Sequence, residues 1–128
     1  MARLRDLVLD SAHPASLARF WAAALDGYAV APYDEAELAR LRGLGIDDPE
    51  DDPTVLLESR DGGPRLWVQL VPEPKRVKNR LHLDLSAPDL ATEVDRLTAL
   101  GATVLARYDG HVVLLDPESN EFCVTRGA

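Results

Sequence analysis

A repeated pattern of strand, helix and turn residues constrains this chain more than any other feature of its sequence. A shift of 74 residues places residues that begin and end elements in the first half on identical residues in the second half. These residues are Leu7, Leu9, Asp10, Pro14, Gly27 and Val30, which fall on Leu81, Leu83, Asp84, Pro88, Gly101 and Val104. Because one half alone would leave a sheet face exposed, we expect both halves of the 128 residues to fold as a single domain.

Hydrophobic periodicity predicts a βαβββ order in each half. In the first half we expect strands over 4–10, 28–31, 54–58 and 66–71, a helix between Pro14 and Gly27, a short helix over 34–41, and a surface loop over 43–53. In the second half we expect strands over 81–85, 103–106, 111–115 and 122–125, and a helix over 88–100. The basic stretch 72–80 contains two prolines, so residues 73–79 are expected to connect module one, about 1–72, to module two, about 80–128.

Composition and charge exclude several classes of function. The formal net charge of −8 would repel a polyphosphate backbone, so nucleic acid is not an expected partner. There is no run of about 18 apolar residues to span a bilayer and no secretory signal, so we expect no membrane partner and a cytoplasmic location. A single cysteine, Cys123, excludes an internal disulfide and a zinc ribbon.

Several motifs point to one known family. They are Leu9-Asp10 with Phe20-Trp21, Trp67-x-Gln69 leading into Pro72-Glu73-Pro74-Lys75, the stretch from Lys78 to Leu85, and Asp116-Pro117-Glu118-Ser119-Asn120-Glu121-Phe122. In these stretches the chain resembles the vicinal oxygen chelate superfamily, and within it the glyoxalase-like branch related to bleomycin-resistance proteins. The resemblance implies an α+β fold of two βαβββ modules that form a cupped mixed sheet, a ligand cleft between the modules, and a homodimer. Because this scaffold hosts isomerases, dioxygenases, epimerases, thiol transferases and drug binders, it does not fix the activity.

The resemblance also implies four positions for a divalent metal, on the first and fourth strands of each module. Three of them fall on Gln69, His82 and Cys123. The position on the first strand falls on Val8 when the Leu-Asp pairs are matched, and on Asp6 when the starts of the helices are matched. A catalytic metal needs several firm ligands and an open position, which one imidazole and one neutral amide do not supply. We therefore expect no metal and no other cofactor; if a divalent metal binds, His82 and Gln69 are its expected ligands.

Strand alternation places several of these side chains on one face. His82, flanked by two leucines in the predicted strand, points into the expected cleft, where an imidazole can transfer protons; the alternative is a hydrogen-bonded interior histidine. Asp84 follows on the same face. Trp67 shares its face with Gln69, so it is either a stacking wall for a flat ligand or part of the packing. Cys123 is expected to be a small hydrophobic residue, because no positive charge lies near it in sequence.

These observations lead to two alternative functions. In the first, the chain is a glyoxalase-like protein that binds a small, partly apolar or aromatic organic molecule without a catalytic metal. In the second, it is a divalent-metal-dependent lyase, isomerase or dioxygenase. The tentative catalytic residue is His82, and the expected ligand-binding residues are Gln69, Trp67, His82, Asp84, Asp6 and Cys123. The sequence leaves open whether the protein is an enzyme.

Overall fold

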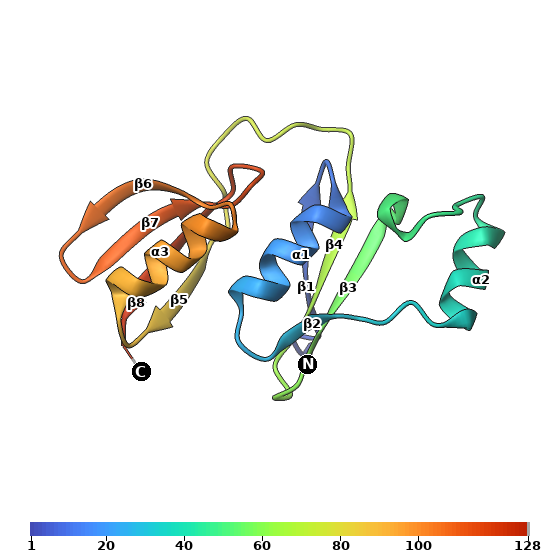
Figure 1. Cartoon of the computed structure of the whole chain (residues 1–128), viewed down its shortest axis with the longest axis horizontal. Helices are drawn as coiled ribbons and strands as arrows, with labels where there is room; N and C mark the ends of the chain where they lie inside the picture. The colour runs from blue at the N-terminus through green and yellow to red at the C-terminus, as the bar shows by residue number, and fades with distance from the viewer. Residues whose placement is uncertain (128) are drawn as a thin grey trace. The chain divides into compact units, whose positions relative to one another are not determined.

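The computed structural model describes residues 1–127, and the chain divides into two compact units, Met1–Glu73 (unit 1) and Pro74–Ala128 (unit 2). Unit 1 contains β1 (Asp6–Ser11), α1 (Pro14–Ala24), β2 (Tyr28–Val30), α2 (Glu35–Gly43), the short 3-10 helix η1 (Pro49–Asp51), β3 (Thr54–Ser59) and β4 (Arg65–Leu70). Unit 2 contains β5 (Leu83–Ala87), α3 (Leu90–Leu100), β6 (Thr103–Tyr108), β7 (His111–Leu115) and β8 (Glu121–Arg126). Figure 1 labels these elements.

The two units have the same sheet topology. Their four-stranded sheets have the strand orders β1-β4-β3-β2 and β5-β8-β7-β6. In each sheet the first pair, β1 with β4 or β5 with β8, is parallel, and the other pairs are antiparallel. The expected α+β fold of two βαβββ modules is therefore confirmed, and unit 1 has two additional helices, α2 and η1, between β2 and β3. Among the described residues, no helix is long and apolar enough to cross a membrane.

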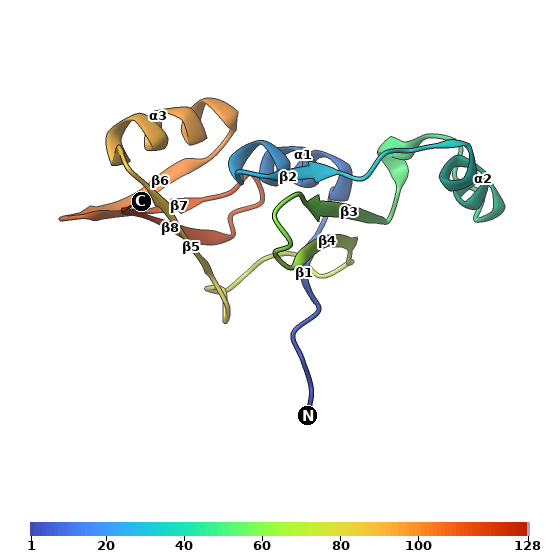
Figure 2. The same ribbon diagram turned by 90° about the horizontal axis from the view of Figure 1, so that it is seen from below.

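One helix covers one face of each sheet and leaves the other face open (Figure 2). In both units the strand residues on the helix side form the core; on β4 and β8 they are Leu66, Val68, Phe122 and Val124. The alternate residues lie on the opposite side, which we call the open face of each unit. Because side chains alternate along a strand, the open face carries Trp67 and Gln69 on β4 and Glu121 and Cys123 on β8.

The second long helix begins later than predicted. α3 starts at Leu90 rather than at Pro88, because the side chain of Asp89 accepts a hydrogen bond from the Thr92 backbone N–H at 3.1 Å and caps the helix there. In α1, by contrast, Pro14 is the first helical residue, as predicted. The matched prolines of the repeat therefore have different roles in the two units.

The start of β5 also differs from the prediction. The prediction of His82 in mid-strand is wrong: the pairing of β5 with β8 begins at Leu83, opposite Phe122, and His82 is the residue before it. The His82 side chain remains partly exposed, at 43% of its surface. This position at the end of a strand leaves the imidazole freer to change its orientation than a position within the sheet would.

Candidate functional site

An ion pair between Asp6 and Arg65, which we call the clamp, holds Trp67 on the open face of unit 1. Asp6 accepts two hydrogen bonds from the Arg65 guanidinium, at 2.9 and 3.0 Å, and one from the Trp67 indole N–H at 3.2 Å. The Arg65 guanidinium also lies over the Trp67 ring, 5.7 Å from its centroid. Hydrogen bonding to Arg65, and to a smaller extent to Trp67, holds the pKa of Asp6 below its usual value, so the carboxylate stays ionised. Asp6 thus orients the indole.

Trp67 lines a hollow of about 780 Å³ within unit 1. The other walls come from β3, from the start of α2 and from the segment that precedes it; the lining residues used below are Tyr33, Asp34, Glu37, Arg40, Asp52, Leu56 and Glu58. Tyr33 donates a hydrogen bond of 2.7 Å to Asp52, which is buried at 3% exposure. Burial, followed by this hydrogen bond, raises the pKa of Tyr33 well above its ordinary value. The hollow therefore has an aromatic wall and a fixed polar wall.

The remaining open-face residues of β1 and β4 are less constrained. Gln69 donates an amide hydrogen bond of 3.0 Å to the carboxylate of Asp10, its partner in the β1–β4 pairing. Val8 lies opposite Trp67 and is 56% exposed, which is unusual for a valine in a strand. Unit 1 therefore presents a neutral amide and an exposed apolar side chain beside the clamp.

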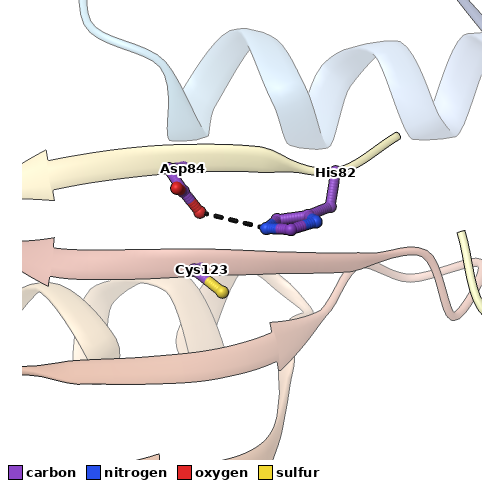
Figure 3. Close-up of side chains that lie close together, drawn as sticks. All are labelled: His82, Asp84 and Cys123. Carbon is purple, nitrogen blue, oxygen red and sulfur yellow. Dashed lines mark ion pairs between the residues drawn. The ribbon is translucent and has the colours of Figure 1, made fainter. Parts of the chain in front are cut away.

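On unit 2, His82, Asp84 and Cys123 come together on the open face (Figure 3). Their ligand atoms all lie within 4.8 Å of one another, and the His82 Nε2 is 3.3 Å from an Asp84 carboxylate oxygen. Asp84 and Cys123 are direct partners in the β5–β8 pairing. Burial, followed by the charge of Asp84 and a hydrogen bond to it, raises the pKa of the Cys123 thiol, and Lys78 opposes this in part. The thiol is therefore protonated in the protein as it stands, and it is not an activated nucleophile.

Glu121 fixes the chain that leads into this cluster. Its carboxylate accepts hydrogen bonds from the Asn79 backbone N–H at 2.7 Å and from the Lys75 ammonium at 3.0 Å. These two donors, the Asn79 N–H first, lower the pKa of Glu121 to about 2. The segment that ends at His82 is in this way tied to β8 at a point two residues from Cys123.

The parallel pairing of β1 with β4 is equivalent to that of β5 with β8, so the site residues of unit 1 can be matched one by one to those of unit 2. Asp10 pairs with Gln69 in unit 1, as Asp84 pairs with Cys123 in unit 2. The residue two positions before Asp84 is His82, and the residue two positions before Asp10 is Val8. Of the two registers that the sequence leaves open, this equivalence favours Val8 over Asp6 for the first family position.

The four family positions do not fit a catalytic divalent metal. Val8 has no donor atom, and Asp6, the other residue considered, is engaged by Arg65 and Trp67. Gln69 offers only a neutral carbonyl oxygen. A set of one amide, one imidazole and one thiol has no carboxylate and only one histidine, which is fewer firm ligands than a catalytic divalent metal needs.

Sequence reasoning identified individual site residues better than their contacts. The cluster of His82, Asp84 and Cys123 consists of residues that the sequence analysis singled out. His82 and Asp84 were expected on one face, and the resemblance placed His82 and Cys123 among the metal positions of the second module. Arg65 was missed, because it lies 59 residues from its partner Asp6 and only the β1–β4 pairing brings the two together. Lys78, which is far from Cys123 in sequence, acts on the thiol through space, but its charge only partly offsets the rise in the pKa of Cys123.

Comparison with known proteins identifies the family. The family model described as "Glyoxalase-like domain" matches residues 6–125. No curated protein matches the chain. Because the matched segment covers most of the chain, it shows family membership.

Solved structures of low sequence identity share the fold. A glyoxalase/bleomycin resistance protein/dioxygenase family enzyme from Burkholderia phytofirmans PsJN is 16% identical, covers 98% of both chains and has a TM-score of 0.66. A fosfomycin resistance protein, FosX, from Mesorhizobium loti is 11% identical over 100% of this chain and 94% of its own, with a TM-score of 0.67. Glyoxalase I from Leishmania major, described as trypanothione-dependent, is 13% identical over 98% of this chain and 87% of its own, with a TM-score of 0.64. The chain belongs to the glyoxalase-like domain family, within the vicinal oxygen chelate superfamily that its motifs resemble.

Proposed function

We propose that this chain binds a small organic molecule with a flat, partly aromatic body, and that it does so without the catalytic divalent metal of its superfamily. The observation that carries this proposal is the clamped Trp67 on the wall of a 780 Å³ hollow. A hollow of this size is in the range of small-molecule sites, which combine apolar and aromatic walls with a few fixed polar groups.

The clamp restricts the motion of the Trp67 side chain, which favours the stacking of a ligand on its ring. An indole held by Asp6, with Arg65 over one face of its ring, has little side-chain freedom left to lose, so a ligand that stacks on its other face meets a smaller entropic cost. Leu56, on the neighbouring strand, adds an apolar surface to the same hollow. These features support a planar ligand.

The charge of the lining favours a ligand that is neutral or positively charged. The hollow is lined by four acidic side chains and by one basic side chain, Arg40. Arg40 is paired with Glu37 at 2.6 Å, and Asp52 is held by Tyr33. The other two acids, Glu58 and Asp34, are exposed, and Asp34 also accepts a hydrogen bond from the Glu37 backbone N–H at the start of α2. With a chain charge of −8, the long-range field also attracts cations.

The second function considered, a metal-dependent lyase, isomerase or dioxygenase, needs His82 and Gln69 as ligands of one catalytic ion. The donor chemistry supports it less well, because Val8 replaces one ligand and Cys123 another. The fold alone does not choose between the two functions, since related proteins of this scaffold have different activities.

A fluorescence titration with a planar aromatic cation tests the proposal. Proflavine is added to the purified chain in excess EDTA, and the anion anilinonaphthalene sulfonate is used for comparison. We expect saturable proflavine binding that is stronger than binding of the anion. Trp67→Ala should weaken it at least about tenfold, which corresponds to ~1.4 kcal/mol of lost stacking.

Tyr108→Ala provides the matched control. Tyr108 is an exposed aromatic residue on β6, outside the hollow, so its removal should leave proflavine binding unchanged. Equal losses in the Trp67 and Tyr108 variants would contradict the proposed location. Binding that appears only when EDTA is replaced by a divalent metal would contradict the metal-free function and favour the second one.

A further inference from the structure

We infer that the ligand of the unit 1 hollow is a planar cation with N–H donors at the edge of its ring system, and that Glu58 is the residue that selects it. Protonated aromatic amines and amidines belong to this class, whereas quaternary and fully N-alkylated cations do not. This inference rests on the proposed function and deepens it, because it names the ligand class of the same hollow.

The strand register places Glu58 beside Trp67 on the open face of unit 1. Leu56 is the direct partner of Trp67 in the antiparallel pairing of β3 with β4. Val55 and Leu57 are buried in the core, so the residues that alternate with them face the other way. Glu58 is therefore a diagonal neighbour of Trp67, at about 7–8 Å. A ligand of two or three fused rings that stacks on the indole spans this distance.

Glu58 is the lining carboxylate that has no hydrogen-bond donor. Among the described residues, its carboxylate has no hydrogen bond and no ion pair, and the residue is exposed. The other three lining acids each accept a hydrogen bond within unit 1; they are Asp34, Glu37 and Asp52. The charge of Glu58 also acts on the clamp, because it contributes, after the hydrogen bond to Asp6, to the raised pKa of Arg65. Glu58 can thus accept a charge-assisted hydrogen bond from a ligand.

The other polar groups of the hollow also favour a ligand that donates hydrogen bonds. Tyr33 donates its hydroxyl hydrogen to Asp52 in a bond of 2.7 Å, and burial and this bond raise its pKa, so the phenol oxygen is left as an acceptor. The Arg40 guanidinium, the strongest donor in the lining, is held by both carboxylate oxygens of Glu37. A ligand without N–H or O–H groups would leave such acceptors unpaired when it displaces water.

Two acridine dyes of equal charge at pH 7 test the inference. Proflavine carries two primary amino groups, and acridine orange has the same ring system with both of these amines fully methylated, so it lacks their N–H donors. Each dye is titrated with the purified full chain in excess EDTA, and its fluorescence is followed. We expect proflavine to bind at least about tenfold more tightly than acridine orange. Glu58→Gln should reduce this preference to about twofold or less, mainly by weakening the binding of proflavine.

Glu35→Gln is the matched control. Glu35 is an exposed acid on α2 that does not line the hollow, so its replacement makes the same change of net charge and should leave both dye affinities within about twofold. A preference for proflavine that persists in Glu58→Gln would assign it to the bulk of the methyl groups and overturn the inference. A preference that is lost equally in Glu35→Gln would overturn it as well, because net charge alone would then explain the loss.

The two dyes also separate failure of this inference from failure of the proposed function. If both dyes bind the wild type with equal affinity and Trp67→Ala weakens both, the proposed function stands and selection by Glu58 is refuted. If neither dye binds saturably, the proposed function is refuted, and the inference with it.

Discussion

Replacing Glu121 with glutamine removes the carboxylate on β8 that accepts hydrogen bonds from Lys75 and Asn79, in the segment that precedes β5. The pKa of about 2, against an ordinary value of 4.5, corresponds to about 3.4 kcal/mol of stabilisation of the charged form at ~1.36 kcal/mol per pK unit. Because the side chains of Glu121 and Lys75 keep 14% and 25% of their surface exposed, solvent screening reduces this contribution. We expect Glu121→Gln to lower the free energy of unfolding by about 1–3 kcal/mol at pH 7.

The pH dependence separates this charge effect from simple loss of packing. The folded-state pKa of Glu121 lies below its unfolded value, so the stabilisation is complete above about pH 4.5 and is lost as the pH falls toward 2. Urea unfolding monitored by far-ultraviolet circular dichroism, to which the helix and strands of unit 2 contribute, should show the difference between wild type and Glu121→Gln shrink by about a quarter at pH 4. It should shrink by more than half at pH 3.

Glu73→Gln is the control for the change in net charge. Glu73 is an exposed glutamate in the same part of the chain, so its replacement should change stability by less than about 0.5 kcal/mol at any of these pH values. A Glu121→Gln difference that stays constant from pH 7 to pH 3, or a difference no larger than that of Glu73→Gln, would refute the reasoning.

Three further predictions concern stability and titration. Ser119 has a φ of 69°, a left-handed conformation that favours glycine, so Ser119→Gly should raise the free energy of unfolding by about 0.5–1 kcal/mol in urea denaturation. Leu114→Ala in the core of unit 2 should cost about 2–5 kcal/mol, whereas Leu105→Ala at a 56% exposed position should cost less than about 1; similar losses would contradict the burial of Leu114. Tyr33→Phe should remove the most alkaline phase of tyrosine ionisation in an absorbance titration, because burial and Asp52 keep the Tyr33 phenol protonated, and an unchanged titration would contradict that contact.

The fold could be predicted from the sequence because its signals are local. Alternation of Leu66, Trp67 and Val68 marks one buried and one open face, and positive-φ glycines such as Gly101 end elements where the pattern stops. The start of α3 was misplaced because proline at position 88 and the capping Asp89 compete as start signals, and the side-chain hydrogen bond of Asp89 decided between them.

The candidate site was less predictable because its contacts are long-range. His82, Asp84 and Cys123 were each named from sequence, but their meeting depends on the parallel pairing of β5 with β8, whose strands are separated by α3 and two further strands. The walls of the hollow in unit 1, including Tyr33 and Asp52, come from segments with no motif. The homodimer and the cytoplasmic location remain predictions.

Because β1 pairs with β4 as β5 pairs with β8, each site residue of unit 2 can be compared with the residue at the same position in unit 1. Val8, Asp10 and Gln69 correspond to His82, Asp84 and Cys123 of the other unit, although Val8 lies within β1 and His82 precedes β5. Val8→His combined with Gln69→Cys would therefore copy the donors of unit 2 onto β1 and β4, with Asp10 already in place. Two thiols that ionise together in an ultraviolet titration of that variant would mean that strand pairing and residue identity set the environment of such a thiol. A second thiol that ionises at a different pH would assign an essential part to the surroundings of Cys123, Lys78 and the hydrogen bonds of Glu121 among them.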